Sequence, residues 1–273
     1  MASIAALIGA THPEASLVVT AAMTALGLSA GLGWQALLLA AAVLAGQFSV
    51  GLSNDWIDRH RDRDAGRTDK PLVTGRLLDA TVLRAAVASL LVCAVLSLGL
   101  GPPAAATHLL AVSLGWAYNL DLKFRLTSVL PYAGAFGLLP LIVGLAAGDE
   151  VTTPAWLMAA AACLGAGAHF AQVLPDLVAD AEQGVEGLPQ RLGPRWSLIA
   201  AAILLGTASL IVTASQQAEA SRSLMAGLAV ILALVATVVV AGLAGRARLG
   251  FRLTLLVALG TVGLLVAGGS PYA

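Results

Sequence analysis

The sequence has few charged residues for its length. Of its 273 residues, 15 are Lys or Arg and 15 are Asp or Glu, so 11% of the chain is charged, against about 25% in an ordinary soluble domain. Hydrophobic residues make up 59%, and the mean hydropathy is +0.89. A soluble protein of this composition could not cover its surface with polar groups. The composition therefore excludes a soluble enzyme, a disordered chain and a nucleic-acid binder with a basic face.

Cysteine is scarce, and basic residues are absent from the start of the chain. The two cysteines, Cys93 and Cys163, both lie in apolar runs and lack the spacing of a zinc or redox motif. This excludes a disulfide scaffold, and we expect both thiols to be core residues. The first fifteen residues contain no Lys or Arg, whereas a cleaved signal peptide begins with a basic region. We therefore expect the first segment to be retained.

Long apolar runs recur from one end of the chain to the other. Apolar stretches of about 17 to 22 residues, separated by short polar segments, have the length of membrane-spanning helices. The sequence predicts nine of them, over residues 15–32, 34–53, 80–100, 103–118, 128–148, 154–173, 195–215, 222–243 and 251–268. The predicted fold is an all-α polytopic membrane protein whose single domain occupies residues 1–273.

The basic residues indicate how these helices are oriented. Of the 15 Lys and Arg, 14 fall in or beside the loops that follow the second, fourth, sixth and eighth helices, and only Arg222 lies on the opposite side. By the positive-inside rule these loops and the N-terminus are cytoplasmic. We expect a multi-pass protein of the inner (plasma) membrane. Its two long charged loops, residues 54–79 and 174–194, are where function is expected on the cytoplasmic side.

The two long loops carry the same pattern of residues. Both read D-x3-D-x3-G-x4-P-x3-G, at an offset of 118 residues. The paired positions are Asp58 and Asp176, Asp62 and Asp180, Gly66 and Gly184, Pro71 and Pro189, and Gly75 and Gly193. The repeat predicts an internal duplication, in which two four-helix units are followed by one further helix.

The spacing of the carboxylates suits a divalent cation. Residues four apart on a helix share a face, so each pair of aspartates presents its oxygens to one region, with an amide one turn earlier. The side chains on these two faces are Asn54, Asp58 and Asp62 in the first motif and Gln172, Asp176 and Asp180 in the second. Mg²⁺ prefers such oxygen ligands and completes its coordination with water and substrate phosphate. Two facing clusters therefore suit two magnesium ions on a diphosphate.

Basic side chains follow the first motif more closely than the second. Arg67 and Lys70 lie just beyond it, while their counterparts are apolar. Lys123 and Arg125, in the loop after the fourth helix, would face the same mouth. All four could bind phosphate oxygens, and for Lys123 and Arg125 a role in setting topology is the alternative.

These motifs resemble those of the UbiA superfamily of intramembrane prenyltransferases. The matching segments are Asn54-Asp55-x-x-Asp58-x-x-x-Asp62, Arg67-Thr68-x-Lys70-Pro71-Leu72, and Asp176-x-x-x-Asp180 with Gly184. Tyr118 and Lys123 are similar to a tyrosine and lysine that follow the fourth helix of the family, although the spacing is one residue longer here. The resemblance covers the whole chain.

The resemblance implies Mg²⁺-dependent transfer of an isoprenyl group from its diphosphate to a lipophilic acceptor, of quinone-precursor or related type, inside the bilayer. By position, one magnesium would be held by Asn54, Asp58 and Asp62, with Asp55 nearby as a further candidate ligand, and the other by Asp176 and Asp180. Arg67, Lys70 and Lys123 would neutralise the leaving diphosphate. Further substrate contacts would come from Tyr118, Gln172 and His169. Trp116, Tyr132, Phe136 and Phe170 are candidate π faces for the allylic cation.

Several residues depart from the family pattern and leave alternatives open. An arginine that commonly precedes the first proline of the family is His12 here, and Gln172-Val173 replaces the usual opening of the second motif. These changes encourage a terpene cyclase, which uses the same site without an acceptor. A third possibility is a transporter or lipid-binding membrane protein whose acidic motifs bind cations, since duplicated halves also occur in transporters. His169 could be a catalytic base or a hydrogen-bonded structural residue.

Overall fold

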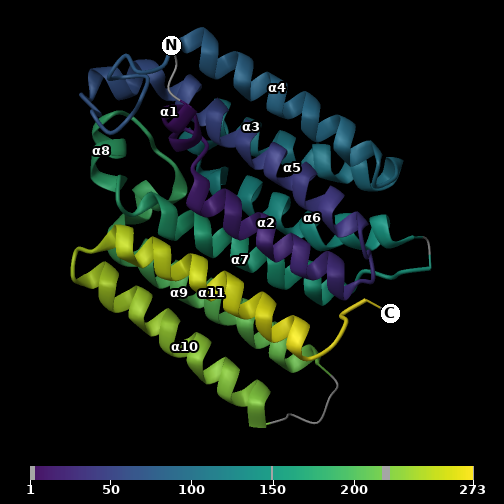
Figure 1. Ribbon diagram of the computed structural model, residues 1–273. Coiled ribbons are helices and arrows are strands. Elements are labelled where there is room, and N and C mark those ends of the chain that lie inside the picture. The colour runs from purple at the N-terminus through teal and green to yellow at the C-terminus, as the bar shows by residue number, and fades with distance from the viewer. Residues whose placement is uncertain (1–3, 149, 217–221, 273) are drawn as a thin grey trace.

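The computed structural model describes residues 4–148, 150–216 and 222–272, and these form helices without any strand (Figure 1). Nine described helices have 17 or more residues: α2 (Pro13–Ser29), α3 (Gln35–Asp64), α4 (Asp79–Leu98), α5 (Pro102–Leu120), α6 (Val129–Ala147), α7 (Ala155–Val173), α9 (Leu188–Ser215), α10 (Arg222–Leu243) and α11 (Ala247–Ala267). Four short helices were not predicted: α1 (Ile4–Gly9), α8 (Leu177–Glu182), η1 (Leu122–Phe124) and η2 (Leu126–Ser128).

Seven of the described helices are long and apolar enough to cross a membrane, namely α3, α4, α6 together with η2, α7, α9, α10 and α11. The apolar α2 has only 17 residues. Helix α5 is not among the seven, and it carries the polar residues His108 and Asn119, each 3% exposed. The predicted all-helical membrane fold is confirmed, while the number of nine crossings stays a prediction.

The boundaries of the two motif segments differ from those expected. Helix α3 continues to Asp64, so the first part of the predicted loop 54–79 is helical. Asp176 stands immediately before α8, and Asp180 lies on it. Helix α9 begins at Leu188 and has a break at Gly193, where the backbone leaves the helical region before Pro194. The aspartates of the first motif are therefore fixed on a long helix, whereas those of the second belong to a short helical turn.

Backbone geometry supports the duplication. Gly66 and Gly184 both have left-handed φ angles, 64° and 76°. The amide of the residue after each glycine donates to the second aspartate of its motif, at 3.0 Å to the carbonyl of Asp62 and 2.9 Å to that of Asp180. Gly75 and Gly193 match in the same way, with φ of 69° and 78°. Each half thus ends its aspartate helix with a glycine cap, because only glycine takes this conformation without steric cost.

We expect Gly66→Ala to destabilise the protein by about 1 kcal/mol. No atom would contact the added Cβ within 4 Å, so the cost would come from the left-handed backbone alone. The matched control is Gly263→Ala, which also meets open space but lies within α11, where alanine is the better helix former. Thermal unfolding in detergent should show a lower Tm for the first variant and an unchanged or higher Tm for the second. Equal Tm values would contradict the assignment of a strained cap.

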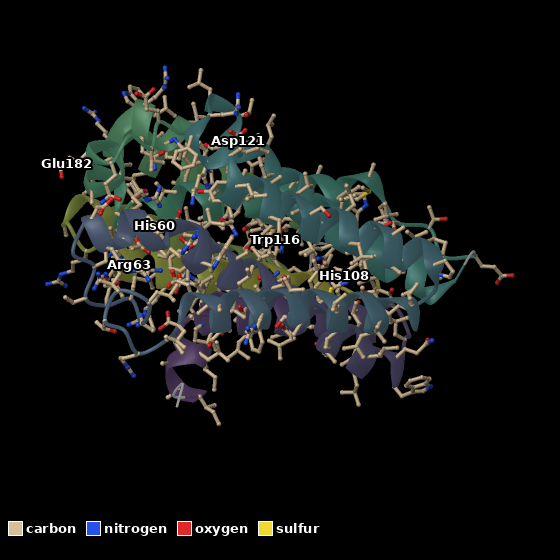
Figure 2. All side chains as sticks on the ribbon, turned by 90° about the horizontal axis from the view of Figure 1, so that it is seen from above. His60, Arg63, His108, Trp116, Asp121 and Glu182 are labelled. Atoms are coloured by element: carbon tan, nitrogen blue, oxygen red, sulfur yellow. The ribbon has the colours of Figure 1, made fainter. Side chains whose placement is uncertain are left out.

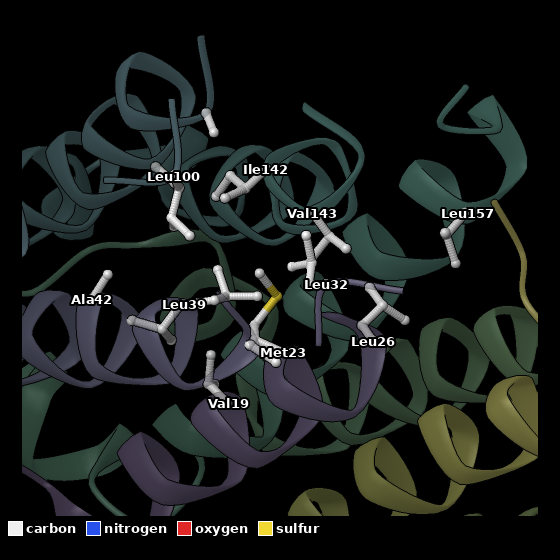
Figure 3. Close-up of a cluster of buried hydrophobic side chains, with 14 of the residues drawn as sticks. Val19, Met23, Leu26, Leu32, Leu39, Ala42, Leu100, Ile142, Val143 and Leu157 are labelled. Carbon is white, nitrogen blue, oxygen red and sulfur yellow. The ribbon is translucent and has the colours of Figure 1, made fainter. Parts of the chain in front are cut away.

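Six helices surround the interior of the bundle. Helices α2, α3, α5, α6, α7 and α11 all line the larger internal cavity, while α4 and α10 lie at opposite edges of the view in Figure 1. The main apolar core packs α2 against α3, α6 and α7 through fully or nearly fully buried side chains (Figure 3), including Met23, Leu39, Ile142 and Leu157. This core occupies the half of the bundle away from the aspartates, so it anchors the helices and leaves the polar end open.

Candidate active site

A large cavity opens at the charged end of the bundle. Its volume is about 660 Å³, which is in the range of small-molecule binding sites. Figure 2 shows His60, Arg63, Asp121 and Glu182 toward this end, with Trp116 and His108 progressively further from it. The predicted site residues that line the cavity are Asn54, Asp58, Asp62, Arg67, Lys70, Tyr118, Lys123, Gln172, Asp176 and Asp180. Two separate motifs and the loop after α5 therefore converge on one space.

Asp58 is the centre of a polar cluster on the cavity wall. Lys123 on η1 donates to its Oδ1, and Arg61 forms an ion pair with Oδ2 at 2.9 Å. The Asn54 amide donates to the same Oδ2 at 3.2 Å. Asp58 is 8% exposed and Lys123 4% exposed, so this charge pair is largely shielded from water. Opposite charges at such a site are strongly coupled.

Asn119, at the end of α5, connects this cluster to the opposite helix. Its side-chain NH₂ donates to the Val50 carbonyl at 2.9 Å and to the Ser53 hydroxyl at 2.8 Å, and its Oδ1 accepts from Asn54 at 3.3 Å. These bonds hold the end of α5 against α3. The loop that carries Lys123 is thereby positioned over Asp58.

Asp55 occupies a different environment from Asp58. Its carboxylate is 3% exposed and does not line the cavity. Oδ1 accepts from Lys70 at 2.6 Å and lies 3.2 Å from His12 Nε2. His12 has a left-handed backbone, with φ of 51°, and is 47% exposed. Asp55 therefore positions Lys70 and His12, and its role as a metal ligand stays a prediction.

Arg67 links the first motif to the second. Its guanidinium pairs with Asp69 at 2.9 Å and reaches Asp176 Oδ1 at 3.5 Å. On the second side, Gln190 donates to Asp180 at 3.1 Å. Hydrogen bonding to Arg67 lowers the pKa of Asp69 to about 2. Asp69 therefore orients a cation at the boundary between the motifs.

One carboxylate in each motif lacks a cationic partner. Across the described ranges, neither Asp62 nor Asp180 forms an ion pair, although both line the cavity. Asp62 is 6% exposed. Burial raises the pKa of Asp180 and outweighs the opposing charge of Arg61, while the neighbouring Asp176 adds to the rise. These two carboxylates are the sites where an added cation would be most favourable.

The pKa values of the two lysines are shifted in opposite directions. Burial lowers the pKa of Lys123, although Asp58 opposes this change. For Lys70, burial also disfavours the charged form, but Asp55 outweighs it and the pKa is raised. Lys70 is thus firmly held as a cation, whereas the charge of Lys123 depends on Asp58.

Asp180→Asn should raise thermal stability at neutral pH while weakening Mg²⁺-dependent diphosphate binding. The folded-state pKa of Asp180 lies above its unfolded value, so its ionisation costs stability as pH rises through that range. Asparagine removes this cost and can still accept from Gln190. Thermal unfolding at pH 4 and pH 8 should show the gain in Tm mainly at pH 8. A lower Tm at pH 8 would contradict the electrostatic explanation.

Aromatic side chains form the wall between the polar end and the apolar interior. Tyr118 and Tyr132 meet edge to face with 5.0 Å between ring centroids, and both line the cavity. The Tyr132 hydroxyl donates to Gln172 at 3.2 Å. Tyr132 and Phe136 also line an adjoining pocket of about 120 Å³ whose walls are almost entirely apolar. The charged end therefore opens directly into a space suited to hydrocarbon.

His169 lies behind this wall. Its ring stacks on Tyr132 at 4.7 Å, and Nε2 lies 3.2 Å from the Ser128 hydroxyl, which accepts from the Leu188 amide. His169 is 1% exposed and lines neither the cavity nor the adjoining pocket. Its Nδ1 is buried and has no hydrogen-bond partner in the described structure. The ring is thus held by Ser128 and Tyr132, and its roles as a catalytic base and in substrate binding stay predictions.

Four residues of the site were not predicted from the sequence. They are Arg61, Asn119, Gln190 and Asp69, which pairs with Arg67. Arg61 lies three residues after Asp58, a spacing that places it on the same helix face, so the sequence did contain a signal for it. The contacts of Asn119 and Gln190 with the motifs arise from the packing of separate elements, and no local spacing in the sequence indicates them. Arg125, a candidate for phosphate binding, is 61% exposed, pairs with Asp121 and does not line the cavity.

The donor set fits magnesium only if a substrate supplies further ligands. In the described part of the chain, no three His, Cys, Asp or Glu side chains are grouped closely enough to hold a metal ion by themselves. Mg²⁺ needs only one or two carboxylates when water and phosphate oxygens complete its coordination. Asp62 and Asp180, free of ion pairs, meet that requirement, with Asp58 and Asp176 beside them. The residues therefore fit a metal bound together with a phosphate group.

Taken together, the fold and the site define an all-helical membrane protein with an acidic and basic cavity at one end. Residues 15–254 match the sequence model of the UbiA prenyltransferase family. The chain belongs to this family. The resemblance expected from the aspartate motifs is thereby confirmed over most of the sequence.

Two curated relatives and several solved structures are similar to this chain. The bacteriochlorophyll synthase 33 kDa chain of Rhodobacter capsulatus is 32% identical over 185 residues, which cover 62% of this chain and 60% of that protein. The protein of the same description from Cereibacter sphaeroides is 28% identical over 200 residues, which cover 68% and 64%. The matches thus span a little under two thirds of the length of these relatives.

The fold is shared with UbiA homologs from two archaea. The apo structure from Aeropyrum pernix K1 has a TM-score of 0.72 and 22% identity, and the match covers 90% of this chain and 96% of that one. The homolog from Archaeoglobus fulgidus bound to DMAPP and Mg²⁺ has a TM-score of 0.68 and 17% identity, with coverage of 95% and 99%. At these identities the likeness establishes the fold alone.

Proposed function

We propose that this protein transfers an isoprenyl group from its diphosphate to a lipophilic acceptor within the membrane, with Mg²⁺ as cofactor. The observation that carries the proposal is the convergence of two aspartate motifs and the cations Arg61, Arg67, Lys70 and Lys123 on one cavity that adjoins an apolar pocket. The A. fulgidus homolog binds an isoprenyl diphosphate together with Mg²⁺, and the chemistry of the donor set described above supports the same pairing here.

The charges explain why metal and diphosphate would bind together. A diphosphate entering the cavity would be repelled by Asp62 and Asp180, which have no cationic partner in the described structure. Magnesium held at Asp58 and Asp62 on one side and at Asp176 and Asp180 on the other would turn this repulsion into attraction. When bound, it neutralises the diphosphate and makes it a better leaving group.

The protein's own cations would complete the binding of the leaving group. Lys70 and Arg67 line the cavity just after the first motif, and Lys123 lines it from η1 beside Asp58. As the bond between the allylic carbon and oxygen breaks, the electron pair leaves with the diphosphate, and these cations stabilise the added negative charge. Tyr118 and Tyr132 then present aromatic faces to the allylic cation.

The acceptor would form a new bond to the allylic carbon in place of the broken carbon–oxygen bond, and it would then lose a proton. The chain belongs to a prenyltransferase family and is similar to proteins described as bacteriochlorophyll synthase chains, which favours transfer to an acceptor. A cyclase built on the same site is the second candidate, favoured by His12 at a position where the family commonly has arginine. In a cyclase the ionised chain would attack itself and no acceptor would be consumed.

Pyrophosphate release by the purified protein distinguishes these reactions. The protein would be incubated with Mg²⁺ and geranyl, farnesyl or geranylgeranyl diphosphate, first alone and then with extracts of lipophilic acceptors, followed by mass analysis of the products. Transfer predicts release that depends on the acceptor and a prenylated product. Release without an acceptor, together with a cyclised hydrocarbon or alcohol, would establish the cyclase. No release under any condition would exclude both.

We also propose that the protein resides in the plasma membrane with the site on the cytoplasmic side. Most of the basic residues lie in the loops after α3, α5 and α10 or on the helix ends beside them, including the start of α9, which supports this orientation under the positive-inside rule. Labelling of a cysteine introduced at Arg76, an exposed loop position, by a membrane-impermeant thiol reagent would test it. Labelling is expected only in inverted vesicles, and labelling of intact spheroplasts would contradict the orientation.

A further inference from the structure

The cavity extends from the aspartates far into the bundle between α3 and α5. Its wall on α3 includes Asp58, Asn54, Val50, Gln47 and Val43, which follow one another along a single helical face. At a rise of about 1.5 Å per residue, Gln47 lies roughly 16 Å along the axis from Asp58. On α5 the matching stripe runs from Tyr118 through Gly115 and Val112 to His108. We call this extension the deep arm.

The far end of the deep arm is polar. His108 is 3% exposed, and its Nδ1 lies 2.8 Å from the Ser97 hydroxyl. Its Nε2 has no hydrogen-bond partner among the described residues. This nitrogen lies close to Gly46 of α3, because a Cβ built on that glycine would be 3.3 Å from it. Gln47, the next residue along α3, likewise forms no side-chain hydrogen bond within the described ranges. Two polar groups on the cavity wall are thus left available to a ligand.

The adjoining apolar pocket provides a contrast. It lies between α2, α6, α7 and α11, and its walls are built almost entirely from apolar side chains such as Met23, Leu139 and Leu157. A hydrocarbon chain that fills this pocket leaves almost no polar group of its walls without a hydrogen-bond partner. In the deep arm, the same chain would displace water from Gln47 and His108 and leave buried polar groups unpaired, which is unfavourable.

We infer that the deep arm binds the acceptor, and that the acceptor carries an oxygen-bearing group, a carbonyl or hydroxyl, at the end remote from its nucleophile. This inference rests on the proposed prenyl transfer and adds to it the chemical class of the second substrate. Gln47 and His108 would hydrogen-bond the remote oxygen, while the isoprenyl chain occupies the apolar pocket. The ring of His108 is oriented for this task by Ser97, which makes Ser97 a positioning residue.

A matched pair of probes tests this assignment. Oestrone is a rigid lipophilic phenol with a ketone at its far end, and its 17-deoxo analogue lacks only that ketone. Binding of each to the full-length protein in nanodiscs, in the presence of Mg²⁺ and geranylgeranyl diphosphate, would be measured by calorimetry. We expect oestrone to bind about tenfold more tightly, the difference that one satisfied hydrogen bond in a buried site provides. Equal behaviour of the two probes, including no binding of either, would overturn the inference.

Variants then locate the contact. Gln47→Leu and His108→Phe should each reduce the preference for oestrone toward unity, and Gln47→Leu keeps the test valid if loss of the Ser97 bond prevents folding of the other. The matched control is Ser113→Leu, which removes a polar group from an exposed position on α5 and should retain the preference. A preference that persists in Gln47→Leu and in a folded His108→Phe would overturn the inference.

The donor is measured in the same samples, which separates this inference from the proposed function. Geranylgeranyl diphosphate should bind the wild type and both deep-arm variants with the same Kd, because the isoprenyl chain occupies the other pocket. If the diphosphate does not bind the wild type, the proposed function fails. If it binds normally but its Kd changes severalfold in Gln47→Leu, the deep arm holds the isoprenyl chain and only the present inference fails.

Discussion

Asp58→Asn should lower Mg²⁺-dependent pyrophosphate release by on the order of a hundredfold to a thousandfold. The substitution keeps the size of the side chain but removes the charge that pairs with Lys123 and Arg61 and that would help to hold magnesium. Lys123 is buried, and burial already lowers its pKa. Without the carboxylate it would lose its proton more readily and could no longer stabilise the leaving diphosphate. Rates measured across pH 6 to 9 would show both effects.

The control for this variant lies on the same helix. Asp64 is the last residue of α3, is exposed and has no ion pair in the described structure. Asp64→Asn should retain the wild-type rate within about twofold, since surface substitutions of this kind have small effects. Nearly full activity of Asp58→Asn, or an equal loss in both variants, would show that the cluster around Asp58 is not the reacting site.

Arg67→Gln should raise the KM for the isoprenyl diphosphate by about tenfold to a hundredfold, as expected for the loss of a charge-assisted hydrogen bond. Arg67 is the residue that spans from the first motif to Asp176 of the second. Its side chain is only 25% exposed and its guanidinium is held by Asp69, so it would meet the diphosphate without a large loss of side-chain freedom. Arg67→Lys should recover part of the affinity, because it restores the charge but not the planar geometry.

Arg125→Gln provides the comparison. Arg125 is at the same end of the bundle but is 61% exposed and pairs with Asp121. Its removal should change KM by less than about twofold, since exposed ion pairs contribute little. If Arg125→Gln raised KM as much as Arg67→Gln, the effect would reflect the general charge of this surface and not a defined phosphate contact.

The sequence predicted the chemistry of the site better than its geometry. Spacing alone identified both aspartate pairs and their repeat, because i,i+4 periodicity and a 118-residue offset are properties of the chain. The separation of Asp55 from Asp58 could not be predicted in this way. Both lie on α3, but one faces Lys70 and His12 while the other faces the cavity, and the difference depends on which neighbours pack against each side.

The same limit applies to contacts made across the bundle. Asn119 contacts Asn54 across 65 residues of sequence, and no local pattern indicates such a pair. His169 shares a helix with Gln172, yet the packing of Tyr132 places only Gln172 on the cavity wall. Helix lengths were also difficult to judge from hydropathy, because α3 continues through the charged segment to Asp64. In its last turns Asp58 and Asp62 are buried, whereas His60, Arg63 and Asp64 are exposed.

The most direct test of the account is whether magnesium and isoprenyl diphosphate require each other and both motifs for binding. Calorimetry would compare Mg²⁺ alone, geranylgeranyl diphosphate alone and the two together, with the wild type, Asp62→Asn and Asp180→Asn. We predict weak binding of each alone and binding at least a hundredfold tighter together, lost in either variant. Tight binding of Mg²⁺ without the diphosphate, as for a cation carrier, or undiminished joint binding in both variants, would contradict the account.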